Sequence, residues 1–120
     1  MNKIFVIGNV VRDAELKEVD VNGVKTPRCR FSVAVNETKS NGENIVNYFE
    51  VTVWREYGAS IAPWVKQGRQ VHVWGTFRLN QYTKDGVVKT ALQIANPQVT
   101  LLGKKPEAEI IEDVEELPFE

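Results

Sequence analysis

Two segments of this 120-residue chain alternate strictly between apolar and polar side chains, and this alternation constrains the fold more than any other feature. Because successive side chains of a strand point to opposite faces, residues 28–36 and 48–54 predict strands with one buried and one outward face. The predicted inner set is Cys29, Phe31, Val33 and Val35 in the first segment and Phe49, Val51 and Val53 in the second.

The rest of the body also predicts strands, separated by turn signals. Asn22-Gly23 and Lys84-Asp85-Gly86 are sequences typical of tight turns. The first expected strand is apolar on both faces, which favours packing of one face against another subunit. The long strand before the second turn has Val71, Val73, Phe77 and Leu79 as its expected inner set. The expected strands cover residues 3–11, 28–36, 48–54, 69–82, 87–94 and 98–102.

One short helix is expected between the third and fourth of these strands, over residues 57–66. Its apolar face would be Ile61, Trp64 and Val65, and Pro63 should shorten or kink it. About five strands with one short helix after the third is the element order of an OB-fold. We therefore predict an all-β, five-stranded OB-fold Greek-key barrel over residues 1–105.

The net charge of −1 conceals a division of the chain into two parts. Residues 1–105 carry a net charge of +6, whereas residues 106–120 hold seven acidic side chains and no basic one. The second segment is too short and too charged to bury a core, so we predict a disordered acidic tail. A basic body with an acidic tail suggests a polyanion binder with a separate interaction tail. A solvated domain with a frayed end is the alternative that charge alone leaves open.

The chemistry-bearing residues argue against an enzyme. The chain has one cysteine, Cys29, and one histidine, His72, which cannot build a disulfide framework or a four-ligand metal cluster. Asp13 and Glu15 have no partner base nearby in the sequence and are interpreted as solvated. No phosphate-binding loop, metalloprotease or C-x-x-C motif occurs, and no apolar run approaches a membrane span. We expect no catalytic residues, no metal, no cofactor and a cytoplasmic location.

Large aromatic side chains lie among arginines on the outward strand positions. Bases of single-stranded nucleic acid stack on such rings, and Lys and Arg neutralise the phosphates. For Trp74, burial against a loop or a neighbouring subunit is the alternative to nucleic-acid contact. The candidate residues for binding single-stranded DNA are Tyr48, Trp54, Tyr82, Trp74, Arg28, Arg30, Arg78, Lys39 and Lys84.

At this point the chain resembles the bacterial and phage single-stranded DNA-binding proteins, in order, from residue 1 to about 103. Ala14 replaces the proline usual in that family, and Thr38-Lys39 stands where a further aromatic residue is often found. The segments that carry the resemblance are Asn2–Val10, Arg12–Leu16, Phe31–Val35, Tyr48–Trp54 and Val65–Val71.

The resemblance implies a homotetramer in which bases stack on Tyr48, Trp54 and Tyr82. It also implies that an acidic tip ending in Pro-Phe recruits replication and repair proteins, with the protein associated with the nucleoid. Glu120 follows the phenylalanine here, which moves the terminal carboxylate away from that ring. The tip residues are Glu115, Glu116, Leu117, Pro118 and Phe119.

The leading hypothesis is therefore sequence-independent binding and protection of single-stranded DNA during replication, recombination and repair. The alternative is a primosome-like OB-fold interaction module that binds DNA weakly and works through its tail. A nucleic-acid-processing enzyme is the third class, and it lacks an identifiable nucleophile, acid–base pair or metal site.

Overall fold

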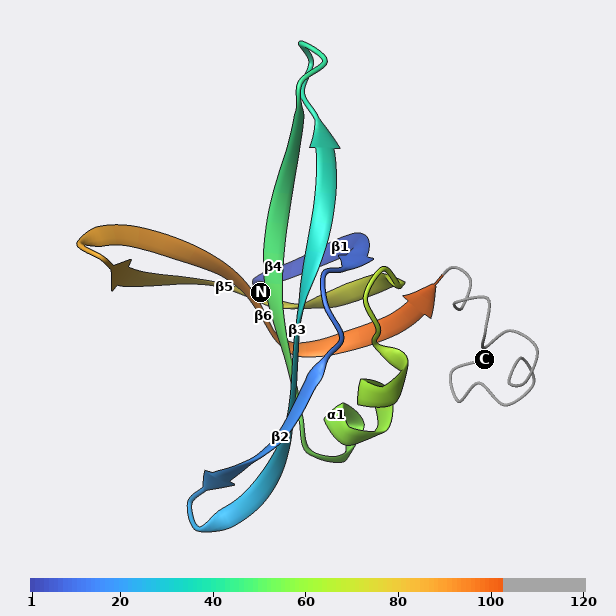
Figure 1. Cartoon of the computed structure of the whole chain (residues 1–120), viewed down its shortest axis with the longest axis vertical. Coiled ribbons are helices and arrows are strands. Elements are labelled where there is room, and N and C mark those ends of the chain that lie inside the picture. Colours follow the sequence, from blue (N-terminus) through green and yellow to red (C-terminus); the bar gives the residue numbers. More distant parts are fainter. Residues whose placement is uncertain (103–120) are drawn as a thin grey trace.

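The computed structural model describes residues 1–102 and forms a β-barrel with projecting hairpins and one short helix (Figure 1). The helix α1 (Arg55–Ile61) runs directly into a 3₁₀ turn, η1 (Ala62–Trp64). The predicted all-β barrel is confirmed. The strands are β1 (Lys3–Val10), β2 (Glu15–Val21), β3 (Val24–Thr38), β4 (Asn44–Trp54), β5 (Gln70–Lys84) and β6 (Val87–Leu102).

The six strands form one sheet in the order β1-β5-β6-β4-β3-β2, and an additional pairing between β1 and β3 closes it. Asn9 pairs with Ala34 at this closure. Gly8 is required beside it, because a Cβ at this position would collide with the carbonyl oxygen of Ala34. All neighbouring strands are antiparallel except β4 and β6, where Phe49 pairs with Leu92 in parallel. This parallel pairing brings the last strand against the middle of the chain.

The barrel core is built from the apolar positions that the alternation predicts. Every member of the two predicted inner sets is buried except Val35, which is partly buried and packs against the core. Because these side chains account for the inner faces of β3 and β4, the alternate positions of both strands point away from the core. The outward positions are thus available for a binding surface.

The helix is shorter than the sequence predicts, and Pro63 is the reason. Helix α1 ends at Ile61, and the chain tightens into η1 around Pro63, which has no backbone N–H to continue the helical ladder. The Tyr57 hydroxyl attaches the helix to β6, accepting a hydrogen bond from the Val99 N–H at 2.8 Å. Ile61 and Val65 are buried, as predicted, so this segment contributes to the core.

Strand β2 is a correction to the sequence prediction, which has no strand between residues 11 and 28. It pairs with β3 along its whole length, from Glu15 opposite Arg30 to Val21 opposite Val24. The expected turn at Asn22-Gly23 connects them, with both residues at positive φ. Because β2 lies at the edge of the sheet and is mostly exposed, its charged sequence carries little apolar alternation. The helix therefore follows the fourth strand rather than the third.

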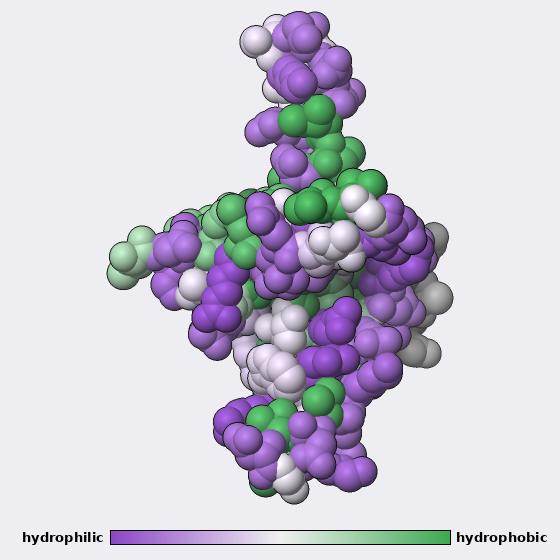
Figure 2. Space-filling model, turned by 90° about the vertical axis from the view of Figure 1, so that its left-hand side faces the viewer, coloured by the Kyte–Doolittle hydropathy of each residue, from purple (hydrophilic) through white to green (hydrophobic). Residues whose placement is uncertain are grey.

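Three hairpins project from the barrel and give the described residues extents of 48 × 46 × 32 Å (Figure 1). The expected turn at Asp85-Gly86 closes the β5–β6 hairpin. Leu79 lies on this hairpin and is exposed, so its predicted place in the core is wrong: β5 has left the barrel by this point. Figure 2 shows hydrophobic side chains exposed on the β3–β4 and β2–β3 hairpins as well. The exposed hydrophobic residues of these two hairpins include Val46 and Val24.

Within residues 1–102, the one α-helix is too short to cross a membrane. The described part of the chain also contains no group of three or more His, Cys, Asp or Glu side chains arranged to hold a metal ion.

Candidate nucleic-acid interface

The outward positions of β3 and β4 form a surface in which arginines lie beside an aromatic ring. In the antiparallel register Arg28 lies opposite Trp54, and Arg30 lies opposite Thr52. Arg78 joins them from β5, because β6 lies between β5 and β4 in the sheet. We call the surface pocket at this junction the arginine pocket, with a volume of about 450 Å³. Its lining residues are Arg28, Arg30, Glu50, Thr52, Trp54, Arg78, Gln93, Ile94, Ala95 and Asn96.

The three aromatic residues predicted to stack on bases are all open to solvent. Tyr48 is 58% exposed, Trp54 40% and Tyr82 43%. Tyr48 and Trp54 lie on the same outward face of β4, whereas Tyr82 lies on the β5–β6 hairpin opposite Lys89. Their outward placement matches the prediction.

The arginines of the pocket are not neutralised by a direct ion pair with another described residue. Among residues 1–102, ion pairs within 4.0 Å join Lys39 to Glu43 and Lys66 to Asp13, and none involves Arg28, Arg30 or Arg78. The Nε atom of Arg28 is buried and has no hydrogen-bond partner within the described chain. A buried donor without an acceptor costs free energy, so this guanidinium is suited to an acceptor that arrives with a ligand.

The pocket also holds polar groups that the sequence prediction missed. Glu50 lies on the outward face of β4, and its Oε1 accepts a hydrogen bond of 3.5 Å from the Gln93 side-chain amide. Glu50 and Gln93 meet because β4 and β6 pair in parallel. The alternation identifies Glu50 as outward-facing, but only the topology places it among three arginines.

Trp74 lies in a different cluster, on the outer face of β1 and β5. Its ring stacks on that of Phe5, with 5.5 Å between centroids, and the Lys3 Nζ lies 5.9 Å from the Trp74 ring centroid. Phe5 also stacks on His72, at 6.2 Å. The structure therefore groups Trp74 with β1 rather than with the arginine pocket.

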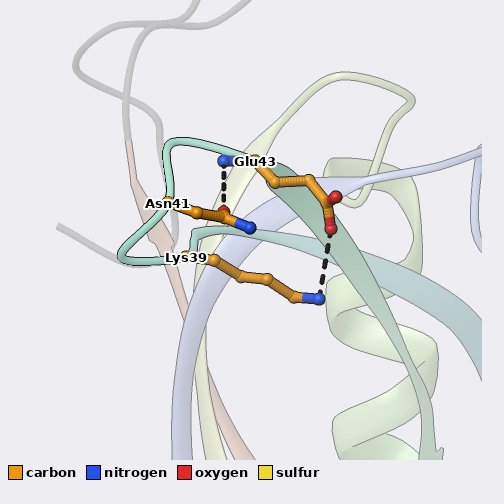
Figure 3. A network of polar contacts seen from close by, with 3 residues as sticks. All are labelled: Lys39, Asn41 and Glu43. Carbon is orange, nitrogen blue, oxygen red and sulfur yellow. Dashed lines mark hydrogen bonds and ion pairs between the residues drawn. The ribbon is translucent and has the colours of Figure 1, made fainter.

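Lys39 lies at the tip of the β3–β4 hairpin and pairs with an acidic neighbour (Figure 3). Its Nζ lies 3.1 Å from the Glu43 carboxylate. The Asn41 side-chain oxygen accepts a 2.9 Å hydrogen bond from the Glu43 N–H and shapes the loop (Figure 3). Part of the Lys39 charge is thus already neutralised, in contrast to the arginines of the pocket.

The remaining candidates lie away from the pocket or beyond the described residues. Lys84 is exposed at the end of β5, next to the turn of the β5–β6 hairpin. The Asp13 carboxylate accepts a 2.9 Å hydrogen bond from the Gln67 N–H, which gives it a structural role. Burial raises the pKa of the Cys29 thiol from 9.0 to about 11. The predicted tail and its tip, residues 106–120, fall outside the described range.

Comparison with known proteins identifies a family and relatives of this chain. The model of the single-strand binding protein family matches residues 1–102. A "Single-stranded DNA-binding protein" of Treponema pallidum is 33% identical over 106 residues, covering 86% of this chain and 58% of that protein. A "Single-stranded DNA-binding protein 1" of Clostridium acetobutylicum is 33% identical over 111 residues, covering 90% of this chain and 99% of that protein.

Solved structures share the fold at lower sequence identity. A structure described as "Plasmodium falciparum SSB complex with ssDNA" has a TM-score of 0.69 at 20% identity, covering 86% of this chain and 96% of that one. The small single-stranded DNA-binding protein of Streptomyces coelicolor has a TM-score of 0.59 at 19% identity, covering 80% and 91%. The barrel and the exposed aromatic residues are consistent with the match to the family model. This chain belongs to the single-strand binding protein family.

Proposed function

We propose that this protein binds single-stranded DNA on the outward faces of β3, β4 and the β5–β6 hairpin. The observation that carries the proposal is the arginine pocket, in which Arg28, Arg30 and Arg78 form no ion pair with any described residue and lie beside the exposed ring of Trp54. Rings stack on bases of any sequence, and guanidinium groups neutralise phosphates. The activity is binding, without covalent chemistry.

The path of the strand follows the remaining exposed aromatics. Tyr48 and Trp54 are six residues apart on one strand face, a separation of roughly 20 Å. Tyr82 continues the path along the projecting hairpin, where Lys84 adds positive charge. Lys39, already paired with Glu43, is expected to contribute less than the free arginines.

We propose that the protein assembles as a homotetramer through β1. Phe5 is 65% and Ile7 54% exposed on the outer face of this strand. Phe5, Trp74 and His72 form a row of stacked rings on the same face. An apolar row on an exposed strand is suited to burial against a second copy, so we assign Trp74 to the subunit interface rather than to the DNA.

The protein is proposed to protect single-stranded DNA in the cytoplasm, at the nucleoid, during replication, recombination and repair. Partner recruitment would use the acidic tip of residues 115–119, which is proposed from the sequence alone. The primosome-like alternative predicts weak DNA binding and a function that is lost when residues 107–120 are deleted.

The test is intrinsic tryptophan fluorescence during titration with oligo-dT at two salt concentrations. Saturable quenching that weakens with salt is expected, because the bound strand stacks on Trp54 and releases counterions. Absence of both quenching and binding by the folded protein would contradict the proposal and favour the tail-based alternative.

A further inference from the structure

The arginine pocket contains a carboxylate, which a site for the phosphate backbone alone would not need. Glu50 lines the pocket together with Arg28, Arg30 and Arg78, and it forms no ion pair within 4.0 Å with any residue of the described chain. Within residues 1–102 its side chain accepts a hydrogen bond from the Gln93 side-chain amide, at 3.5 Å. A free carboxylate repels phosphate, so it marks a place for a group that donates hydrogen bonds.

Hydrogen-bond donors and acceptors line the pocket together with an aromatic ring. Arg28 lies opposite Trp54 in the register, and Glu50 lies four residues before Trp54 on the same face of β4. The guanidinium can only donate and the carboxylate can only accept. A ligand must therefore be flat enough to stack on Trp54, with acceptors on one edge and donors on another. The volume of about 450 Å³ is in the usual range of small-ligand sites.

Guanine is the base that meets these requirements best. Its O6 and N7 atoms accept both hydrogen bonds of an arginine fork, the commonest specific contact between proteins and bases. Its N1–H and 2-amino group are adjacent donors that match the two oxygens of a carboxylate. Adenine and cytosine each offer a carboxylate one amino group, and thymine offers only its N3–H.

Resting on the proposed function, we propose that the arginine pocket holds one unpaired guanine of the bound strand. The base stacks on Trp54, donates from N1 and its 2-amino group to Glu50, and accepts at O6 and N7 from Arg28. The buried Nε of Arg28, which lacks a partner within residues 1–102, gains an acceptor after a rotation of its side chain. Arg30 and Arg78 remain for the flanking phosphates. The protein would then bind any single strand but prefer one with a guanine at this position.

The experiment measures affinity for dT oligomers, one site size long, that carry a single central substitution. A central dG should bind about 5- to 150-fold more tightly than dT, the range for one good bidentate contact. Replacing that guanine by 7-deazaguanine removes N7, and replacing it by hypoxanthine removes the 2-amino group. Each replacement should remove most of the preference. Equal affinity for dG, dA, dC and dT would overturn the inference.

Two variants assign the contacts. Glu50→Gln should abolish the difference between dG and dT, whereas Glu18→Gln, which removes the same charge on exposed β2, should preserve it. Arg28→Lys keeps the charge but loses the fork, so it should also abolish the preference. If it instead weakens every oligomer equally, Arg28 contacts phosphate and the inference is wrong. Circular dichroism verifies that each variant is folded.

The two proposals fail in different ways. Tight binding of all-dT with no guanine preference would refute only the guanine site. Failure of the folded wild-type protein to bind all-dT at any salt concentration would refute the proposed function itself.

Discussion

Replacing Trp54 by alanine removes the ring at the centre of the proposed DNA path. Loss of one stacked base costs about 1–3 kcal/mol by alanine substitution, which corresponds to a roughly 5- to 150-fold rise in Kd for oligo-dT. Because Arg28, Arg30 and Arg78 remain, the salt dependence of binding should change little. The variant should therefore bind more weakly at every salt concentration. Its plot of log Kd against log salt concentration should run nearly parallel to that of the wild-type protein.

The same substitution has a structural cost that must be separated from the binding effect. Trp54 is 40% exposed, so more than half of its surface packs against neighbours. A buried tryptophan covers about 150–250 Å², so removing this packing costs up to about 3 kcal/mol at 25 cal/mol per Å². A domain with the usual 5–15 kcal/mol of stability stays folded at 25 °C. A loss of about 3 kcal/mol should lower the melting temperature by about 10–25 °C.

The assay is fluorescence anisotropy of labelled oligo-dT at 25 °C, with thermal melts of the same samples. Trp54→Phe is the matched control, because it keeps a stacking ring and should retain most of the affinity. A folded Trp54→Ala protein with wild-type affinity would refute the assignment of Trp54 to the DNA surface.

Three further predictions concern charge, assembly and the buried thiol. Arg78→Ala should reduce the magnitude of the log–log salt slope by about 0.7, the value for one phosphate on a single strand, as measured by titration at several salt concentrations. Ile7→Lys should shift the assembly to smaller species in light scattering, and an unchanged mass would contradict the β1 interface. Burial raises the pKa of the Cys29 thiol from 9.0 to about 11 in the folded protein. The buried, protonated thiol therefore contributes fully to stability below pH 9, and this contribution is lost as the pH rises through 11. Denaturant melts should show this loss in wild type but not in Cys29→Ala.

The barrel could be predicted where burial imposes alternation on the sequence. Cys29, Phe31 and Val33 are buried because each second residue of β3 faces the core, and the pattern is visible without any structure. Strand β2 could not be predicted because its side chains are mostly exposed and show little apolar alternation. It is an edge strand held by its pairing to β3. Leu79 was misplaced for a related reason, since its strand continues beyond the barrel while its apolar alternation persists.

The candidate site could be predicted only one strand at a time. The outward aromatics Tyr48 and Trp54 follow from the alternation of β4, and the structure leaves both exposed. That Glu50 lies beside Gln93 depends on a parallel pairing between strands about forty residues apart. Local sequence patterns carry no information about such a pairing, because any outward side chain could face any other.

Trp74 illustrates the limit of alternation most clearly. It has the same expected outward parity as Arg78, four residues later on β5, yet the two belong to different surfaces. The register of β5 against β6 shifts between Trp74 and Thr76, and Gly75 fits there because a Cβ would collide with β6 at Ala95 and Ile94. β5 pairs with β1 as far as Thr76, and within this paired stretch Trp74 stacks on Phe5. Beyond Thr76 the strand leaves β1, and Arg78 reaches the pocket beside β4. One strand can thus contribute to both proposed surfaces, the subunit interface and the DNA surface, because it pairs with β1 only as far as Thr76 and continues beyond it beside β6.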